Sequence, residues 1–317
     1  MDDLFLLPRA KVISSEYQSD CVITLFAIPK PFVGHIGVIQ RNAITSWTLL
    51  QPKPEIILFG DDEGTAEICS ELGLKHVPNV ARNQYSTPYL DDLFHQAQQL
   101  AGYPALCYVN ADIILLSDFT QLLNRLMSFE KNWLAILRRW EVKIEKLLNF
   151  EQPDWEKNLQ NFVLSTGRPP FHGVDCFIFP SGFYKDILPF ALGRGYWDDW
   201  LIWYAHKMKA RIFDASDCAM TIHQGHPGYN ANASSAMAAE VKHNYELDGK
   251  WRFIFHKSIP THKLTNTHVL PVPQTEYFRH VAYRFLSHTV GSTYILRRRL
   301  GLYRWWQNKD RPICSNS

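Results

Sequence analysis

The chain has 317 residues, of which 46% are hydrophobic and 20% are charged, so it is long enough for one large domain or two small ones. These proportions are ordinary for a soluble globular protein. The formal net charge is +2, which gives no electrostatic argument for a nucleic-acid partner.

The first half of the chain alternates short apolar runs with segments of helical spacing. The run at 21–28 ends at Pro29 and predicts a strand buried on both faces. Further elements follow in order: a helix at 41–50, a strand at 55–59, a helix at 65–72, a short strand at 75–78 and a helix at 88–100. This alternation predicts an α/β fold with a mostly parallel sheet and helices on both faces.

Two apolar runs between Cys107 and Leu116 meet at a polar joint, Asn110-Ala111-Asp112. In an extended backbone, side chains two apart point the same way, so Asn110 and Asp112 are predicted to project together at a strand end. A buried carboxylate is costly unless it is paired or binds a metal, and open α/β sheets bind ligands at their strand ends. The joint is therefore a candidate site; alternatively, Asp112 caps a helix starting near Ser117.

Four more aspartates lie at the ends of these elements. Asp61 and Asp62 precede a helix, where they could cap it or hydrogen-bond a nucleobase or ribose. Asp91 and Asp92 fall in a first helical turn, where negative charge suits the helix dipole. We assign one of them a structural role and the other, Asp92, to support of the site around Asp112.

No glycine-rich dinucleotide motif or phosphate loop occurs in the sequence. If a nucleotide binds, its phosphates must be held by something other than such a loop, and a metal ion bound to Asp112 could hold them.

The second half continues with a helix at 117–129, a strand at 133–137, a polar helix-prone connection at 149–167, and a turn that leads into a buried strand within 171–180. Asp175, at the start of the last strand, is either a turn residue or a substrate contact. The pattern then predicts a helix that ends near Met208.

Two adjacent carboxylates, Asp198 and Asp199, begin that helix beside Trp197 and Trp200. They could cap the helix, or supply a general base, which needs a carboxylate near the reacting hydroxyl. The two tryptophans suit either a core or a sugar-stacking platform.

Two histidines, His223 and His226, follow an apolar strand in a segment rich in glycine and proline. Histidines are usually ordinary surface or core residues, but two at this spacing raise the case for a metal ligand, since neutral imidazole binds transition metals.

Taken together, these motifs resemble those of GT-A glycosyltransferases, over roughly residues 20–256. Asn110-Ala111-Asp112 is similar to the family's DxD metal motif, and Trp197-Asp198-Asp199 is similar to its xED catalytic motif. His223 or His226 matches the histidine that commonly completes the metal site. Two departures stand out: Asn110 is neutral where the family has aspartate, and Asp198 is one methylene shorter than glutamate.

The resemblance implies a GT-A, Rossmann-like catalytic domain over 1–260, with a nucleotide-binding half at about 20–116 and an acceptor half at about 117–260. A C-terminal basic and aromatic helical extension would cover 261–317. The residues implied in donor binding are Ala27, Ile28, Pro29, Asp61, Asp62, Asp92, Asn110 and Ala111, and those implied in acceptor binding are Asp175, Trp197 and Trp200.

The implied reaction is glycosyl transfer from a nucleoside-diphosphate sugar, a UDP or GDP sugar, to a hydroxyl acceptor, which would be a glycan, a lipid-linked molecule or a small molecule. A divalent cation, Mn²⁺ or Mg²⁺, would be held by Asp112 and a histidine. Asp199 is implied as the general base, with Asp198 beside it and inversion at the anomeric carbon.

The composition changes after residue 260, and residues 278–306 are aromatic and basic. Leu296, Leu300 and Tyr303 fall on one helical face, which is typical of a membrane-surface helix; the alternative is a helix docked on the catalytic domain. The six cysteines form no Cys-x-x-Cys pair, and neither a signal-peptide pattern nor a membrane-spanning run occurs. We expect a reduced, cytoplasmic protein with peripheral membrane contact as an option.

Three rival functions share the same residues. A nucleotide-sugar or carbohydrate-binding protein without turnover would tolerate loss of Asp199. A metal-dependent hydrolase would use Asp112, Asp175 and His223 and would need no acceptor. A nucleotidyltransferase would usually carry a glycine-rich basic loop after the first strand, which Pro29-Lys30-Pro31 does not supply.

Overall fold

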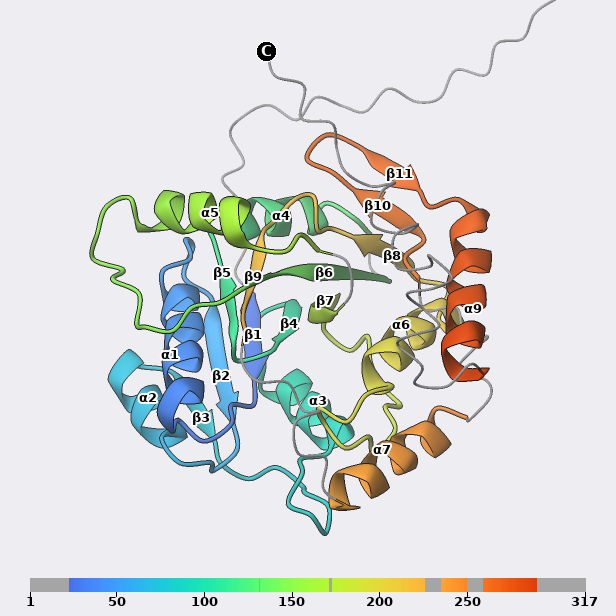
Figure 1. Cartoon of the computed structure of the whole chain (residues 1–317), viewed down its shortest axis with the longest axis horizontal. Helices are drawn as coiled ribbons and strands as arrows, with labels where there is room; N and C mark the ends of the chain where they lie inside the picture. Colours follow the sequence, from blue (N-terminus) through green and yellow to red (C-terminus); the bar gives the residue numbers. More distant parts are fainter. Residues whose placement is uncertain (1–22, 131, 171–172, 226–234, 250–258, 290–317) are drawn as a thin grey trace, which may run out of the picture.

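A computed structural model describes residues 23–130, 132–170, 173–225, 235–249 and 259–289. A central β-sheet runs through the molecule, with helices packed against both of its faces (Figure 1). The strand order is β11-β10-β8-β6-β7-β4-β1-β2-β3, and β5 and β9 form a branch attached to β6. The α/β fold predicted from the sequence, with helices flanking a sheet, is confirmed.

The first half of the chain builds a parallel sheet in the order β3-β2-β1-β4. Its strands are β1 (Thr24–Ala27), β2 (Glu55–Phe59), β3 (Lys75–Val77) and β4 (Ala105–Val109). Its helices are α1 (Gly34–Thr48), α2 (Thr65–Leu72) and α3 (Leu90–Leu100). Each strand predicted in this half is present. The apolar runs are short and bounded by proline and glycine, which is the pattern of a buried strand.

Helix α1 begins at Gly34, earlier than the start that the sequence predicts at Arg41. Gly34 and Gly37 are poor helix formers, so helix propensity does not predict the first turns of α1. Gly37 is needed there, because a Cβ atom at this position would lie 2.7 Å from the carbonyl oxygen of Phe32.

The second half adds both parallel and antiparallel strands. The elements are β5 (Ile113–Leu115), α4 (Asp118–Leu126), β6 (Trp133–Val142), α5 (Trp155–Thr166), β7 (Val174–Pro180), α6 (Trp197–Lys207), β8 (Arg211–Asp214), β9 (Thr221–Gln224) and α7 (Ser235–Leu247). Strand β7 runs antiparallel to β4 and β6, while β8 and β9 run parallel to β6. Parallel pairs still outnumber antiparallel ones among the described strands.

Strand β6 joins the two parts of the sheet. Its first half, Trp133–Ile136, pairs with β8, and its second half, Arg139–Val142, pairs with β9. The sequence predicts this strand only as far as Leu137, so the extension through Val142 is a correction. The polar residues after Leu137 break the apolar run, but their backbone remains in the sheet because β9 supplies its hydrogen bonds.

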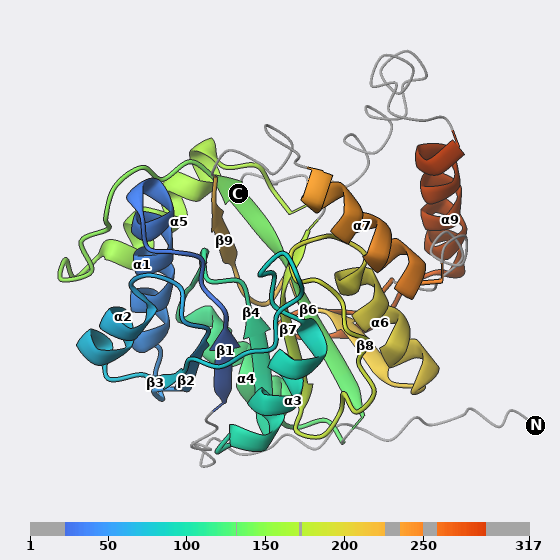
Figure 2. The same ribbon diagram turned by 90° about the horizontal axis from the view of Figure 1, so that it is seen from below.

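The two faces of the sheet carry separate hydrophobic clusters. Along β1, Leu25 and Ala27 face the cluster formed with α1, α2, α4 and α5, whereas Phe26 faces the cluster formed with α3 and α6. This alternation is the period of an extended strand. Figures 1 and 2 show α1 and α2 near the β2–β3 end of the sheet and α6, α7 and α9 (Gln274–Thr289) at the other. Both faces of the central strands are therefore buried, as predicted.

The sheet continues beyond residue 260. Strand β10 (His262–Leu264) pairs with β8 and with β11 (Val269–Pro271), and α9 follows. Among the helices that the structure describes, none has the length and apolarity needed to cross a bilayer. The predicted membrane-surface face at Leu296, Leu300 and Tyr303 lies outside the described residues.

Asp118 gives the fold an expected pH dependence. Its Oδ2 accepts a hydrogen bond from the Met220 N–H (2.8 Å), and burial raises the pKa of its carboxyl to about 6. The folded state therefore holds this proton more tightly than the unfolded chain does. The contribution of this carboxyl to stability is expected to fall as pH rises from about 4 to about 6 and to level off above that.

We expect the Asp118→Asn variant to lose about 1–3 kcal/mol of this pH-dependent change, because an amide cannot ionise. Urea unfolding of both proteins at several pH values between 4 and 7 measures the difference. Asp217→Asn, at a half-exposed position, is the control. An identical pH slope in wild type and Asp118→Asn would contradict the assignment.

Candidate functional site

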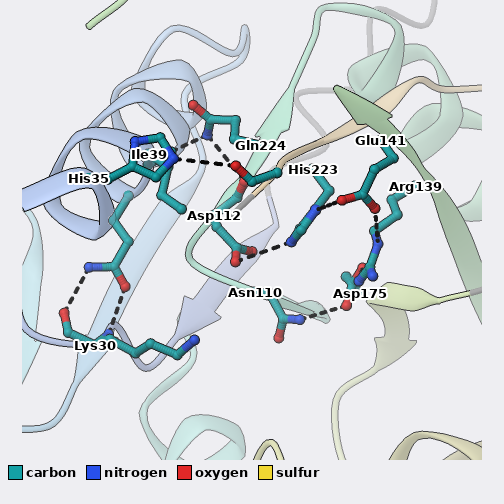
Figure 3. A network of polar contacts seen from close by, with 12 residues as sticks. Lys30, His35, Ile39, Asn110, Asp112, Arg139, Glu141, Asp175, His223 and Gln224 are labelled. Carbon is teal, nitrogen blue, oxygen red and sulfur yellow. Dashed lines mark hydrogen bonds and ion pairs between the residues drawn. The ribbon is translucent and has the colours of Figure 1, made fainter. Parts of the chain in front are cut away.

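The polar joint between β4 and β5 is a turn. The N–H of Ile113 donates to the carbonyl oxygen of Asn110 (3.1 Å), so the backbone between them is not extended as predicted. Asn110 and Asp112 nevertheless face one network of polar side chains (Figure 3), in which they contact different partners. Asp112 does not cap α4, because the N-cap residue of that helix is Ser117. The N–H and the hydroxyl of Ser117 both donate to Glu156.

Asp112 lies beside His223, as the sequence predicts for a shared metal site. Asp112 Oδ2 is 3.5 Å from His223 Nε2, and Glu141 Oε1 is 3.0 Å from His223 Nδ1 (Figure 3). His223 is only 7% exposed. Burial alone would lower the pKa of this imidazole, but its hydrogen bonds to Asp112 and Glu141 raise it to about 9.

The strand register explains why these groups meet. His223 on β9 is in register with Ile113 on β5 and with Glu141 on β6. Side chains of residues in register share a face of the sheet, so Glu141 is placed next to His223, and Asp112 precedes Ile113 directly. His223 therefore lies in a strand, not in the glycine-rich loop expected from the sequence. His226 lies outside the described residues.

Asn110 is held by two neighbours within the protein. Its Oδ1 accepts a hydrogen bond from the Tyr108 hydroxyl (2.9 Å), and its Nδ2 donates to Asp175 Oδ1 (2.7 Å). Asp175 Oδ2 pairs with Arg139, which also lies 3.4 Å from Glu141. Both oxygens of Asp175 are thus engaged, and burial raises the pKa of its carboxyl against the opposing charge of Arg139.

The end of β1 lies beside this network. Beyond Ala27, Ile28 and Pro29, the backbone of Lys30 is bound twice by Gln40, which accepts from its N–H and donates to its carbonyl oxygen (both 2.7 Å). In Figure 3, Lys30 and Asn110 both lie below Asp112. This pairing fixes the segment that the sequence predicts to bind the nucleotide.

Asp61 and Asp62 are joined to Arg82 by ion pairs of 3.3 and 2.7 Å. Neither caps α2, whose N-cap is Gly64 without a side-chain hydrogen bond, so the capping alternative is wrong. Asp61 is 75% exposed and is accessible to a ligand.

Asp92 accepts hydrogen bonds from the Ala81 N–H (2.7 Å) and from Gln96 (2.8 Å). These contacts tie the loop that carries Arg82 to helix α3. Asp92 therefore supports the Asp61–Asp62–Arg82 cluster through the loop, whereas the sequence assigned it to the surroundings of Asp112.

Asp198 and Asp199 lie in the first turn of α6. Burial, together with the charges of Asp199 and Asp175, raises the pKa of Asp198 to about 7. The influence of Asp175 brings the start of α6 into the electrostatic field of the joint.

Trp197 and Trp200 are 6% and 4% exposed. The indole of Trp197 packs edge-on against Tyr108, with ring centroids 5.6 Å apart, and Trp200 packs against Phe190 at 5.5 Å. Of the two roles that the sequence left open, burial favours the core, since a sugar platform needs an open ring face.

No three His, Cys, Asp or Glu side chains converge on a complete metal site within the described ranges. Two ligands that each lie about 2.1 Å from one ion are about 3 Å apart when their bonds are at right angles. The 3.5 Å between Asp112 Oδ2 and His223 Nε2 is close to this separation. The pair therefore fits two positions of a divalent cation, and substrate oxygens and water would have to fill the others.

Glu141 strengthens this fit. Metal-binding histidines usually donate their second ring N–H to a carboxylate, and Glu141 is placed to accept it from Nδ1 of His223. Neither Glu141 nor Arg139 is predicted from the sequence as a site residue. A signal was present, because the two alternate on one face of an extended backbone, but it required the strand to continue past Leu137.

Comparison with solved structures identifies the fold. The structure of S. aureus TarS 1–349 matches 89% of this chain and 74% of that chain, with a TM-score of 0.50 and 11% sequence identity. A Pyrobaculum calidifontis mannosyltransferase with GDP-Man and Mn²⁺ matches 90% and 81% of the two chains (TM-score 0.46, 14% identity). The chain has the GT-A glycosyltransferase fold, a mixed α/β sheet flanked by helices.

GalNAc-T7, solved with UDP, GalNAc and Mn²⁺, matches 86% of this chain at a TM-score of 0.49 and 13% identity, and this chain spans 58% of the GalNAc-T7 chain. No protein-family model matches the sequence, and no curated protein matches it. The likeness to known proteins is therefore one of fold.

The Asn110–Asp175 contact leads to a prediction about charge. Asn110→Asp would place a second carboxylate beside Asp175 and remove a donor, so we expect it to destabilise the fold by about 1–3 kcal/mol. The double variant Asn110→Asp/Asp175→Asn keeps the number of charges and reverses the hydrogen bond, and should recover at least half of that loss. Urea unfolding of both single variants and the double variant gives the coupling energy. Strictly additive effects of the two substitutions on the free energy of unfolding would contradict the predicted coupling between positions 110 and 175.

Proposed function

We propose that the protein is a glycosyltransferase, which transfers a sugar from a nucleoside-diphosphate sugar to a hydroxyl group of an acceptor. The observation that carries the proposal is the pairing of Asp112 with His223 at the end of a central strand, with Glu141 behind the histidine. Ligands bind at this edge of open α/β sheets. The shared fold supports the same class of reaction.

A divalent cation, proposed to be Mn²⁺ or Mg²⁺, would be held by Asp112 and His223 and would stabilise negative charge on the diphosphate leaving group. Glu141 orients His223 so that Nε2 faces Asp112. The donor is proposed to be a UDP or GDP sugar. The end of β1 at Ala27–Pro29 and the exposed Asp61 are proposed to contact its nucleoside.

Asp199 is proposed as the general base, which removes the proton of the acceptor hydroxyl as its oxygen attacks the anomeric carbon and inverts it. Its place in the first turn of α6, beside Asp198, supports this role. A general base must be a carboxylate or imidazole within reach of the reacting hydroxyl, and a carboxylate at a helix start beside the joint meets this requirement.

The acceptor is proposed to be a glycan, a lipid-linked molecule or a small molecule in the cytoplasm. Contact of the basic C-terminal segment with a membrane surface remains a proposal from the sequence. The hydrolase alternative needed Asp175 as a metal ligand, and this is disfavoured because Asn110 and Arg139 occupy its two oxygens.

Thermal unfolding with UDP, GDP, CDP or dTDP, each with and without Mn²⁺, tests the proposal. We expect one diphosphate to raise the melting temperature in the presence of Mn²⁺, since a ligand at a hundred times its Kd adds about 2.7 kcal/mol to stability. In the Asp112→Asn variant the Mn²⁺-dependent part of the shift should be lost.

Glu141→Gln should weaken Mn²⁺ binding about 10- to 100-fold, as expected when the carboxylate behind a histidine ligand loses its charge. Titration with Mn²⁺ in the presence of the nucleotide measures this directly. A wild-type protein that shows no shift with any nucleotide would overturn the proposal, and an unchanged Mn²⁺ affinity in Asp112→Asn would overturn the metal assignment.

The base assignment is tested by a pair of isosteric variants. Asp199→Asn should lower kcat about 10²- to 10⁴-fold with donor binding unchanged, because the amide cannot accept the proton. Asp198→Asn should have a smaller effect. If Asp199→Asn kept full activity, Asp199 would not be the base.

A further inference from the structure

Arg168 occupies a defined place in the segment between α5 and β7. Its N–H donates to the carbonyl oxygen of Glu141 (2.8 Å), and the Glu141 N–H donates to the carbonyl oxygen of Arg168 (3.0 Å). Antiparallel residues that exchange both hydrogen bonds lie directly opposite one another, and their side chains emerge on the same face. The side chain of Arg168 therefore leaves the backbone on the face that carries the carboxylate of Glu141.

That face is the one that holds the candidate metal pair. On the opposite side of β6, Glu141 is in register with His223, whose ring lies 3.5 Å from Asp112. Arg168, Glu141 and His223 thus form one row across the strands. The hydrogen bond from His223 lowers the pKa of Glu141 against the effect of burial, and the charges of Arg139 and Arg168 lower it further, which agrees with this proximity.

The guanidinium of Arg168 is available, whereas its neighbours are engaged. Arg139 pairs with Asp175 and Glu141, and Lys143 pairs with Glu145. Arg168 is exposed and forms no ion pair within the part of the chain that the structure describes. Glu141, the carboxylate nearest to it in the row, is turned toward His223 and Arg139.

We infer that Arg168 binds a phosphate group of a substrate seated beside the Asp112–His223 pair. This inference rests on the proposed function and adds a binding residue to it. The donor's diphosphate and a phosphate carried by the acceptor share this chemistry.

The charges of the site explain why such a residue is needed. Asp112, Glu141 and Asp175 place three carboxylates around the joint, and Arg139 is consumed by two of them. The divalent cation proposed on Asp112 and His223 would offset part of this negative charge, and a guanidinium at the edge of the row adds a further positive charge that faces the phosphate. A guanidinium is suited to this because its planar fork donates two parallel hydrogen bonds to phosphate oxygens.

The test is a calorimetric titration of the full chain with whichever of UDP and GDP binds the wild type in the presence of Mn²⁺. The variants are Arg168→Gln, Arg168→Lys and, as a control, Lys157→Gln at an exposed position of α5. A second arm titrates inorganic phosphate into protein saturated with the nucleotide and Mn²⁺. A third arm titrates inorganic pyrophosphate with Mn²⁺.

We expect Arg168→Gln to weaken nucleoside-diphosphate and pyrophosphate binding about tenfold or more, Arg168→Lys to recover part of it, and Lys157→Gln to match wild type. The affinity for the corresponding nucleoside should not change. A loss confined to the second arm assigns the residue to a phosphate on the acceptor.

Equal affinities of wild type and Arg168→Gln in all arms, with equal melting temperatures, would overturn the inference and leave the proposed function standing. A wild-type protein that binds neither nucleotide nor pyrophosphate nor phosphate would overturn both. The two failures are therefore distinguishable.

Discussion

The site depends on a buried histidine held between two carboxylates. His223 is 7% exposed, and Asp112 and Glu141 raise the pKa of its imidazole although burial opposes this. The arrangement requires β9 to lie between β5 and β6, since each neighbouring strand places one carboxylate. It therefore also requires a β6 long enough to pair with β8 at one end and with β9 at the other. The change of partners along one strand is the structural origin of the site.

The neutral residue at position 110 is explained by the charge next to it. In the DxD pattern that the joint resembles, an aspartate would stand here, but Asn110 donates to Asp175 and accepts from Tyr108. The carboxylate beside this position is that of Asp175 at the start of β7, and Arg139 compensates its charge. An aspartate at both positions would leave one buried charge uncompensated, which is costly. The neutral residue at position 110 is thus consistent with its surroundings.

The fold could be predicted from the sequence where apolar runs end at strong breakers. The strand at 55–59 and the helix at 65–72 have their predicted bounds, because glycine and proline mark their ends. The joint at Asn110–Asp112 was located for the same reason. Glu141 could not be found this way, since its significance comes from its pairing with β9, a strand some eighty residues further along the chain that no local pattern connects to it.

The buried tryptophan of α6 links the core to the chemistry. Trp197 packs on Tyr108, and the hydroxyl of Tyr108 donates to Asn110, so one aromatic contact joins the start of α6 to the joint. The next two residues in the chain are the aspartate pair. A core role for the indole is compatible with the catalytic role proposed for its neighbours, because a rigid anchor at the first helical residue fixes where the following carboxylates lie. The sequence places these residues side by side, and the packing of Trp197 on Tyr108 connects the pair to the joint.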